Sequence, residues 1–400
     1  MRILIVYNSA LDSTSVSGVQ TYFSGVVRRW SELGVITDVL VAQAAWPVFK
    51  SLFPASRLIS SDSLFDPSRH LGQTWRYLPA FGWRMFSHRF AHFPTTYDVT
   101  FACAQFVYEV GPARALARRF GGALVAKVHH VLGAQRAAHG IFDRMHLASE
   151  RISTRWLNRE ADAILCGTEL IARDFNALES RLGLTPSRTF STGYGLDLEA
   201  LPLSVDSEKE FDAVLLGRVH EHKGVFDVVP LWQRVLEVKP SARLLVVGEG
   251  PHRLELENRV RAAGLAHAVT LTGAVSEAEK CRLLSRCRIG LSLSREEGWG
   301  LSVNEFLGIG LPVVAMEVPV FRSVFPHQLD LVPQGDISAA ANRVVHWLDH
   351  PEESRRRGIE GREFVKRYDH RAVAERELEI LKEAVRRRRV KGGRVEGLKG

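Results

Sequence analysis

The stretch SREEGWGLSVNEFLGIGLPVVA, Ser294 to Ala315, decides how this chain is interpreted. Two glutamates, Glu297 and Glu305, stand eight positions apart, with a Gly-Trp-Gly turn between them and a Gly-Ile-Gly-Leu-Pro break after them. Because an apolar run precedes the stretch, we predict a strand, a glycine turn and the start of a short helix. Unpaired backbone N–H groups and the helix dipole make such a helix start suitable for binding a phosphate group.

The residues around the predicted helix start are candidates for binding one ligand. Glu305 falls about one turn into the helix, where its carboxylate could accept both hydroxyls of a vicinal diol such as ribose. Glu297, in the loop, could accept hydrogen bonds from sugar hydroxyls. Glycines let a backbone approach a ligand closely, and the further candidates are Gly298, Trp299, Gly300 and Leu301. The alternative is that both acids only favour a helix N-terminus electrostatically.

The composition describes a globular protein with more than one core. A chain of 400 residues predicts two domains, and 46% hydrophobic with 24% charged residues is ordinary for a soluble protein. Four cysteines without a CxxC pair indicate a reducing compartment and argue against structural zinc. Neither a signal peptide nor an apolar run of membrane-spanning length is apparent, so we expect a cytoplasmic protein.

Apolar runs alternate with helix-like segments along the whole chain. The series begins with RILIVY at 2–7 and restarts with FDAVLLG at 211–217, after the polar linker LPLSVDSEKE at 201–210. This alternation predicts an α/β fold with two doubly wound, Rossmann-like parallel-sheet domains. Ligands of such sheets bind at the carboxyl ends of the strands, so the cleft between the two domains is the expected site.

The segment GRVHEHKG, 217–224, follows a predicted strand and supplies two cations. Arg218 and Lys223 could hold a diphosphate, the arginine as a planar fork and the lysine as a point charge. The alternative is a solvated basic loop. His220 and His222 form an HxH pair around Glu221, but no cysteine stands nearby in the sequence, and we expect no metal ion there.

Further along, VVGEGPHRLELE at 246–257 is half of a dinucleotide-binding fingerprint. Gly248 and Gly250 fit a tight turn from strand to helix, but Arg253 takes the place of the third glycine. The next strand ends in Gly273, where a ribose-binding acid would be needed, so an NAD-dependent two-domain oxidoreductase is disfavoured.

Two first-domain segments carry candidates of lower specificity. KVHH ends a strand, so His129 or His130 would face the cleft and could orient hydroxyls or carry protons, although a packed structural histidine is the more frequent role. In NSALDSTSVSGVQTY, 8–22, Gly18 sits where backbone amides can meet an anion. The alternative for that segment is a surface loop.

Taken in order, these segments resemble the retaining glycosyltransferases of family 4, the group 1 glycosyltransferases. GRVHEHKG, LLVVGEGP, VTLTGAVSEAEKCRLLSRCRIGLSLS and EEGWGLSVNEFLGIGLPVVA match over Asp212 to Tyr368, and SGVQTY, KVHH, ADAILCGTEL and STGYGLD match less closely in the first domain. The resemblance implies the GT-B fold, two Rossmann-like domains across a cleft. We therefore expect an acceptor-binding domain at 1–203, a nucleotide-sugar domain at 204–370, and a helix at 371–400 that returns to the first domain before a basic tail.

The resemblance also implies a role for each candidate. Glu305 resembles the acid that binds the nucleotide ribose, and Glu297 the acid that contacts the donor sugar. Arg218 and Lys223, next to Gly217, resemble the diphosphate pair.

In the first domain, His129 resembles a histidine near donor sugar and acceptor, with His130 in its place if the register slips. Gly18 resembles the second glycine of a Gly-Gly loop whose first position is Ser17 here.

The implied activity is retaining transfer of a hexose from a UDP- or GDP-linked donor to an acceptor hydroxyl, such as that of a lipid-linked or cell-envelope glycan. No metal, cofactor or nucleic-acid partner is expected. Two alternatives share the fold: a non-catalytic sugar-nucleotide-binding module and a GT-B-type sugar-nucleotide epimerase.

The segment TWRYLPAFGWRMFSHRFAHF, 74–93, mixes aromatic residues with arginines in a chain of net charge +8. Aromatic and basic neighbours suit the headgroup boundary of an anionic membrane, so we expect peripheral contact with the inner face of a membrane. The alternative is a core helix whose arginines extend outwards. The basic residues proposed for this contact are Arg76, Arg84, Arg89, Arg114, Arg118 and Arg119.

Overall fold

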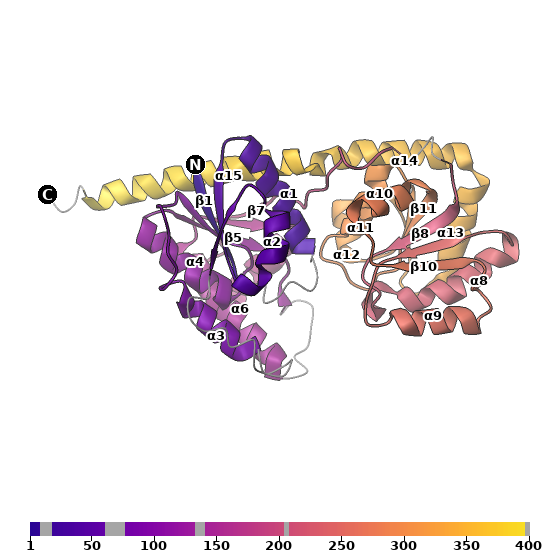
Figure 1. Ribbon diagram of the computed structural model, residues 1–400, viewed down its shortest axis with the longest axis horizontal. Helices are drawn as coiled ribbons and strands as arrows, with labels where there is room; N and C mark the ends of the chain where they lie inside the picture. Colours follow the sequence, from indigo (N-terminus) through magenta and orange to yellow (C-terminus); the bar gives the residue numbers. More distant parts are fainter. Residues whose placement is uncertain (9–17, 61–76, 133–140, 204–207, 397–400) are drawn as a thin grey trace. The chain divides into compact units, whose positions relative to one another are not determined.

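The computed structural model describes residues 1–8, 18–60, 77–132, 141–203 and 208–396. They form two compact units (Figure 1): Met1–Gly195 with His370–Gly400, and Leu196–Asp369. The sequence predicts these boundaries at 203/204 and 370/371, so the first one lies eight residues earlier in the structure. Leu196 belongs to the second unit because it forms a parallel β-bridge with Asp369 and donates its N–H to Tyr368 O over 2.9 Å.

The first unit is built on a parallel sheet whose described strands run in the order β3-β2-β1-β4-β5-β6-β7. Apolar residues fill the central strands, which suits strands that helices cover on both faces. The strands are β1 (Arg2–Tyr7), β2 (Ile36–Val41), β3 (Arg57–Ser60), β4 (Val99–Ala102), β5 (Ala123–Val128), β6 (Ala163–Cys166) and β7 (Thr189–Ser191).

Helices cover both faces of this first sheet. They are α1 (Gly18–Glu32), α2 (Trp46–Leu52), α3 (Tyr77–Ser87), α4 (Val107–Phe120), α6 (Ile141–Glu160), α7 (Glu169–Arg181) and α15 (His370–Glu396). On one face, α4, α6 and α7 share a core with alternate residues of the strands, Val6 and Ala126 among them. On the other face, Phe23 and Trp30 of α1 pack against Phe101 of β4.

The C-terminal helix α15 packs against α1 and β5 (Figure 1). It contributes the buried carboxylate of Glu377 to the first unit. Lys127 of β5 and Glu377 of α15 are wholly buried, and their Nζ and Oε1 atoms lie 2.7 Å apart. Lys127 Nζ also donates to Tyr22 Oη over 2.9 Å and to Thr192 Oγ1 over 2.6 Å. Burial lowers the pKa of Lys127, although Glu377 acts in the opposite direction. We call these four residues the buried lysine cluster.

The second unit has a parallel sheet whose described strands run in the order β10-β9-β8-β11-β12-β13. The strands are β8 (Phe211–Leu216), β9 (Leu244–Val247), β10 (Val269–Gly273), β11 (Cys287–Ser292), β12 (Val313–Met316) and β13 (Leu329–Val332). The helices are α8 (Val228–Val238), α9 (Arg253–Ala262), α10 (Glu277–Ser285), α11 (Leu301–Ile309), α12 (Pro319–Val324), α13 (Ile337–Asp349) and α14 (Pro351–Val365). Both sheets confirm the predicted α/β class with two Rossmann-like parallel sheets.

Alternation along the strands of the second unit places different helices on its two faces. Ala213 and Leu215 of β8 share a core with α8, α9 and α13. Gly290 of β11 points to the opposite face, where a Cβ atom would lie 2.5 Å from the ring of Phe306 in α11. The short α11 therefore sits directly on β11, which fixes where its N-terminus lies.

The order of strands in the second sheet reverses between β8 and β11. These two strands pair in parallel, with Leu215 opposite Leu291. Ligands of open α/β sheets bind outside the carboxyl ends of the strands at such a reversal. The loops that follow β8 and β11 begin at Gly217 and Leu293, so they leave the sheet as neighbours at this point.

No helix within the described ranges is both long enough and apolar enough to cross a membrane.

Candidate functional site

An ion pair joins the two loops at the carboxyl edge of the second sheet. Lys223, in the loop after β8, donates from Nζ to Glu297 Oε1 in the loop after β11. Ser294 Oγ donates to the same carboxylate oxygen over 2.8 Å. The backbones join as well, because Arg295 N–H donates to His222 O over 2.8 Å. The structure thus brings together Lys223 and Glu297, which the sequence analysis proposed from separate motifs.

Glycines allow these loops to pack backbone against backbone. Gly217 has φ 145° and Gly224 has φ 65°, values that glycine adopts readily and other residues adopt rarely. A Cβ atom on Gly224 would lie 2.0 Å from Leu293 O, and one on Gly248 would lie 1.9 Å from Gly217 O. Larger residues would push the loops after β8, β9 and β11 apart.

The start of α11 is the place where the sequence predicts an anion site. The helix begins directly after Gly300, whose φ is 98° and where a Cβ atom would lie 2.6 Å from the ring of Phe321. The first intrahelical bond is donated by Asn304 N–H to Gly300 O over 3.0 Å. The N–H groups of residues 301–303 therefore precede the helical ladder and have no intrahelical acceptor.

The two residues before Gly300 differ in exposure. Gly298 is exposed, whereas Trp299 is buried among aromatic rings. Its ring centroid lies 4.8 Å from that of Tyr368 and 6.0 Å from that of Phe325, in edge-to-face arrangements. The indole of Trp299 therefore anchors the loop to the core of the second unit, and a role for this residue in ligand binding stays a prediction.

Glu305 lies in α11 and pairs with a lysine of the neighbouring helix α10. Lys280 Nζ lies 2.5 Å from Glu305 Oε1 and 2.6 Å from Glu277 Oε2. Burial raises the pKa of the Glu305 carboxyl, and Lys280 opposes that shift. Burial also acts against the charge of Lys280, but Glu305 and Glu277 outweigh it and raise the lysine pKa above its ordinary value.

The remaining predicted cation, Arg218, stands apart from these pairs. Its side chain is exposed, and it has no ion-pair partner within the described residues. Sequence reasoning missed Lys280 and Ser294, since each looks like an ordinary polar residue of its segment. Their contacts join residues from different motifs, and only the fold reveals such contacts.

The HxH pair of the β8 loop forms a contact of its own. His222 Nδ1 lies 2.6 Å from His220 Nδ1, and the ring of His252 lies edge-on to His220 at 4.8 Å. Burial, with help from Lys223 and His220, lowers the pKa of His222. Within the described residues, no three His, Cys, Asp or Glu side chains are arranged to hold a metal ion.

In the first unit, both ring nitrogens of His129 have partners. Nε2 lies 2.7 Å from the carbonyl oxygen of Cys103, so Nε2 carries the proton and Nδ1 accepts from Tyr194 Oη. Burial and the nearby Lys127 lower the pKa of His129 to about 3, which leaves its ring neutral. His130 is half-buried.

Gly18 is the exposed first residue of α1. The loop before it, including Ser17, lies outside the described residues, so its predicted role in anion binding stays a prediction.

Comparison with known proteins now adds to this geometry. The sequence profile of the family described as glycosyl transferases group 1 matches residues 203–364. Residues 203–364 are a group 1 glycosyltransferase domain. This domain contains the Lys223–Glu297 pair, the start of α11, and Glu305 with its partner Lys280.

Curated relatives match part of this chain. A phosphatidyl-myo-inositol mannosyltransferase of Mycobacterium leprae is 30% identical over 171 residues, covering 42% of this chain and 45% of the relative. A GDP-mannose:cellobiosyl-diphosphopolyprenol alpha-mannosyltransferase of Xanthomonas campestris is 26% identical, covering 49% of this chain and 53% of the relative. The chain thus spans about half the length of the curated relatives it matches.

Solved structures extend the likeness of fold to both units. The Anabaena HepE protein, solved with UDP and glucose, superposes with a TM-score of 0.71 at 15% identity, covering 96% of this chain and 99% of that one. A sucrose-phosphate synthase of Thermosynechococcus elongatus gives a TM-score of 0.73 at 19% identity, covering 96% of this chain and 98% of that one. The predicted GT-B fold is thereby confirmed.

The segment proposed to touch a membrane is only partly exposed. Arg84 is buried, with 1% of its surface exposed, and its Nη1 donates to Asn8 O over 2.8 Å. The proposal that Arg84 meets a membrane is therefore wrong, because this arginine helps to hold α3 against the end of β1. Phe86 and Phe90 are exposed at the end of α3, and residues 74–76 lie outside the described part of the chain.

Three of the other basic residues proposed for this contact, Arg114, Arg118 and Arg119, have protein partners. Arg114 and Arg118 lie 2.5 Å and 2.6 Å from Glu160 Oε1, and Arg119 lies over the ring of Phe93 at 5.5 Å. Of the arginines near this segment, Arg89 is the exposed one on the same stretch as the two phenylalanines.

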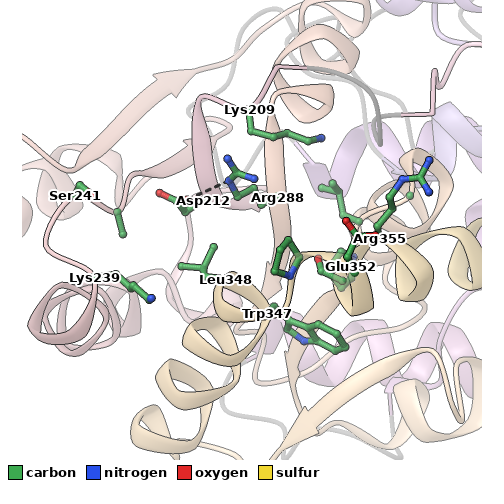
Figure 2. Close-up of a pocket in the computed structure, with 15 residues that line it drawn as sticks. Lys209, Asp212, Lys239, Ser241, Arg288, Trp347, Leu348, Glu352 and Arg355 are labelled. Carbon is green, nitrogen blue, oxygen red and sulfur yellow. Dashed lines mark ion pairs between the residues drawn. The ribbon is translucent and has the colours of Figure 1, made fainter.

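A pocket of 620 Å³ lies in the group 1 domain (Figure 2), and none of the predicted site residues is among the residues that line it. Asp212 and Arg288 line it, at the amino ends of β8 and β11, and they pair at 3.4 Å. The pocket therefore opens at the edge of the sheet opposite to the Lys223–Glu297 pair. The candidate site at the strand reversal and this pocket are therefore separate places in the group 1 domain.

Proposed function

We propose that the chain is a retaining glycosyltransferase that moves a hexose from a UDP- or GDP-linked donor to an acceptor hydroxyl. The observation that carries the proposal is the Lys223–Glu297 pair, which joins the loops after β8 and β11 where the strand order reverses. An ammonium, a carboxylate and a helix start meet at this edge. These groups match the phosphates and hydroxyls of a nucleotide sugar.

In this proposal the diphosphate of the donor binds at cations and backbone amides. Negative charge grows on the diphosphate oxygens as the bond to the sugar breaks. Arg218, Lys223 and the N–H groups of residues 301–303 would stabilise that charge where it develops. Lys223 gives one of its three N–H donors to Glu297, so two remain for phosphate oxygens.

The two carboxylates would hold the two sugars of the donor. Glu305 would accept the ribose hydroxyls, and Glu297 would accept hydroxyls of the hexose. Lys223 would then have two roles: it would orient Glu297, and it would neutralise the diphosphate beside it. This double contact fits a donor that folds across the start of α11.

The transfer exchanges one bond at the anomeric carbon for another. The bond from the anomeric carbon to the diphosphate oxygen breaks, and the acceptor oxygen bonds to the same face. The acceptor proton passes to an oxygen of the departing diphosphate. His129 resembles the histidine placed near both sugars, and its neutral ring, with a pKa of about 3, suits a contact better than a base. Neither a metal ion nor another cofactor has a required part in this scheme.

We further propose a lipid-linked or cell-envelope glycan as the acceptor. Two aligned relatives are named for transfer to phosphatidyl-myo-inositol and to a cellobiosyl-diphosphopolyprenol. The exposed Phe86 and Phe90 near Arg89 would suit a protein that works beside a membrane surface.

A binding and transfer screen tests the proposal. Purified protein is heated with UDP-, GDP- and ADP-sugars, and a donor present at 100 times its dissociation constant should add about 2.7 kcal/mol of stability. The stabilising donor is then used in transfer assays with lipid-linked acceptors, before and after exhaustive EDTA treatment. We expect transfer with retained anomeric configuration, and equal rates in both conditions.

Other outcomes separate the alternatives. A donor that binds but is neither hydrolysed nor transferred would indicate a binding module. A changed sugar nucleotide formed without any acceptor would indicate an epimerase. Activity that EDTA removes and Mg²⁺ restores would contradict the metal-independent scheme, and a lack of binding to every nucleotide sugar would refute the proposal as a whole.

A further inference from the structure

Lys280 occupies an unusual place for a lysine on a surface helix. It lies on α10, only 12% of its side chain is exposed, and its Nζ sits between two carboxylates. One of these belongs to Glu277 of the same helix, whose side chain is 80% exposed. The other belongs to Glu305 of α11, which is 21% exposed. The better buried contact of Lys280 is therefore the one that crosses to the predicted ribose acid.

We propose that Lys280 is a positioning residue of the donor site, which holds the carboxylate of Glu305 in place for the two ribose hydroxyls. This inference rests on the proposed function and assigns it a further residue. Lys280 bonds Oε1 of Glu305, which leaves Oε2 and the second lone pair of Oε1 for a vicinal diol. A carboxylate fixed at one oxygen keeps its rotamer and presents the rest of its acceptors in one direction.

The charge of Lys280 matters as much as its position. A ribose diol donates hydrogen bonds, so it needs Glu305 ionised. Burial acts against that ionisation, and Lys280 is the cation that opposes it, while Glu277 acts in the same direction as burial. The thiol of Cys281 also faces this group, with its own pKa raised by burial. Without Lys280, Glu305 would share a half-buried position with one acid, one neutral thiol and no cation among its described neighbours.

A purely structural role makes a different prediction. If Lys280 only braced α10 against α11, its loss would lower stability or weaken all ligands equally. If it positions Glu305, its loss should act selectively on the ribose hydroxyls. The preference for a ribonucleotide over its 2′-deoxy analogue separates the two roles, because the deoxy compound lacks one hydroxyl of the diol and keeps the base and both phosphates.

The test measures dissociation constants of UDP and 2′-deoxy-UDP, and of GDP and 2′-deoxy-GDP, by calorimetry between pH 6.0 and 8.5. For the base that the wild type prefers, we expect the ribonucleotide to bind roughly 10- to 100-fold more tightly, as for a hydrogen bond to a charged group. Lys280→Met should reduce this ratio toward one at pH 6.0, and the ratio should rise again with pH as Glu305 ionises. Lys280→Arg, which keeps the charge, should preserve most of the preference.

Controls make the result specific to Glu305. Lys239 pairs with Asp349 away from this site, so Lys239→Met is a matched loss of a lysine and should leave the ratio unchanged. In a Glu305→Gln background, Lys280→Met should have no further effect on the ratio. If Lys280→Met does not fold, Lys280→Gln makes the same test with a smaller change of shape.

Three outcomes have distinct meanings. A wild-type ratio in Lys280→Met at every pH overturns the inference while leaving the proposed function intact. The inference is also overturned if Lys280→Met lowers the ratio equally in the wild-type and Glu305→Gln backgrounds, because Lys280 would then act independently of Glu305. If wild-type protein binds neither UDP-glucose nor GDP-mannose nor their nucleotides, the proposed function fails first and the inference fails with it.

Discussion

The molecule contains two lysine–glutamate pairs that are similar in chemistry and opposite in surroundings. In the buried lysine cluster of the first unit, Lys127 and Glu377 are wholly buried, and the ammonium gives hydrogen bonds to three side chains. In the second unit, Lys280 and Glu305 are 12% and 21% exposed. Their ion pair leaves carboxylate acceptors for a ligand. The comparison shows that solvent access, more than the residue types, separates a structural pair from a candidate functional one.

The largest effect is expected when the buried Lys127–Glu377 pair is broken. Lys127→Met should destabilise the first unit by about 3–5 kcal/mol, because it leaves the Glu377 carboxylate buried without its cation. Lys280→Met should cost less than this, because its pair with Glu305 is partly exposed and the other is wholly buried. Hydrogen exchange by mass spectrometry reads the two units separately, through peptides of β5 and α15 and of α10 and α11.

The comparison between the pairs would not hold if both variants lost the same free energy of unfolding. A double variant, Lys127→Met with Glu377→Leu, sharpens the test, since an apolar replacement of both partners should recover much of the loss. Failure to recover would mean that Tyr22 and Thr192 require the charges as partners.

The second expected effect concerns transfer. Arg218→Ala and Glu305→Ala should each lower kcat/KM by a factor equivalent to about 2–4 kcal/mol, because each removes a charged contact made to the donor in the transition state. Their thermal stability should change little, as Arg218 is exposed and Glu305 is partly exposed.

Exposed residues of α8 supply the matched controls for these transfer measurements. Arg234 and Glu237 are exposed, and Arg234→Ala and Glu237→Ala should transfer at the wild-type rate. Near-normal kcat/KM in folded Arg218→Ala and Glu305→Ala proteins would remove the assignment of this edge as the donor site.

Sequence reasoning predicted the two loops that carry the candidate site because the residues of each loop are neighbours in the chain. The glycines and the order of elements predict the loops after β8 and β11, and those loops carry Lys223 and Glu297. The partners Lys280 and Glu377 could not be found in this way. Glu377 stands 250 positions from Lys127, and nothing in the helical pattern of α15 marks it as buried.

Arg84 is a residue that sequence reasoning wrongly assigned to the surface. Its aromatic neighbours indicate a surface as readily as a core, and only the bond to Asn8 O decides between them.

The third prediction uses the buried histidine beside the lysine cluster. The pKa of His129 is lowered from 6.5 to about 3, so between these pH values the unfolded chain binds a proton that the folded chain does not. The free energy of unfolding therefore falls as the pH is lowered below 6.5, by about 1.4 kcal/mol per pH unit from this group. Its full contribution is present above pH 6.5.

Comparison with His129→Gln isolates this group. The stability of the wild type minus that of the variant should fall by about 2 kcal/mol between pH 7 and pH 5, as measured by urea denaturation at several pH values. A difference that stays constant with pH would show that the ring of His129 is protonated as readily in the folded chain as in the unfolded one.

The smallest expected effect extends the contrast between buried and exposed charge to α3. Arg84 is buried and bonded to Asn8 O, whereas Arg89 is exposed beside Phe86 and Phe90. A basic residue near an anionic membrane contributes roughly 1 kcal/mol, so Arg89→Ala should weaken binding to anionic vesicles by about fivefold. Phe86→Ser with Phe90→Ser should weaken it further by removing apolar surface that enters the headgroup region.

Co-sedimentation with vesicles at low salt, with and without anionic lipid, measures this binding, with Arg234→Ala as the control. Wild-type protein that stays in the supernatant with anionic vesicles would contradict a membrane contact at α3, and a water-soluble acceptor would then fit the proposed transferase better than a lipid-linked one.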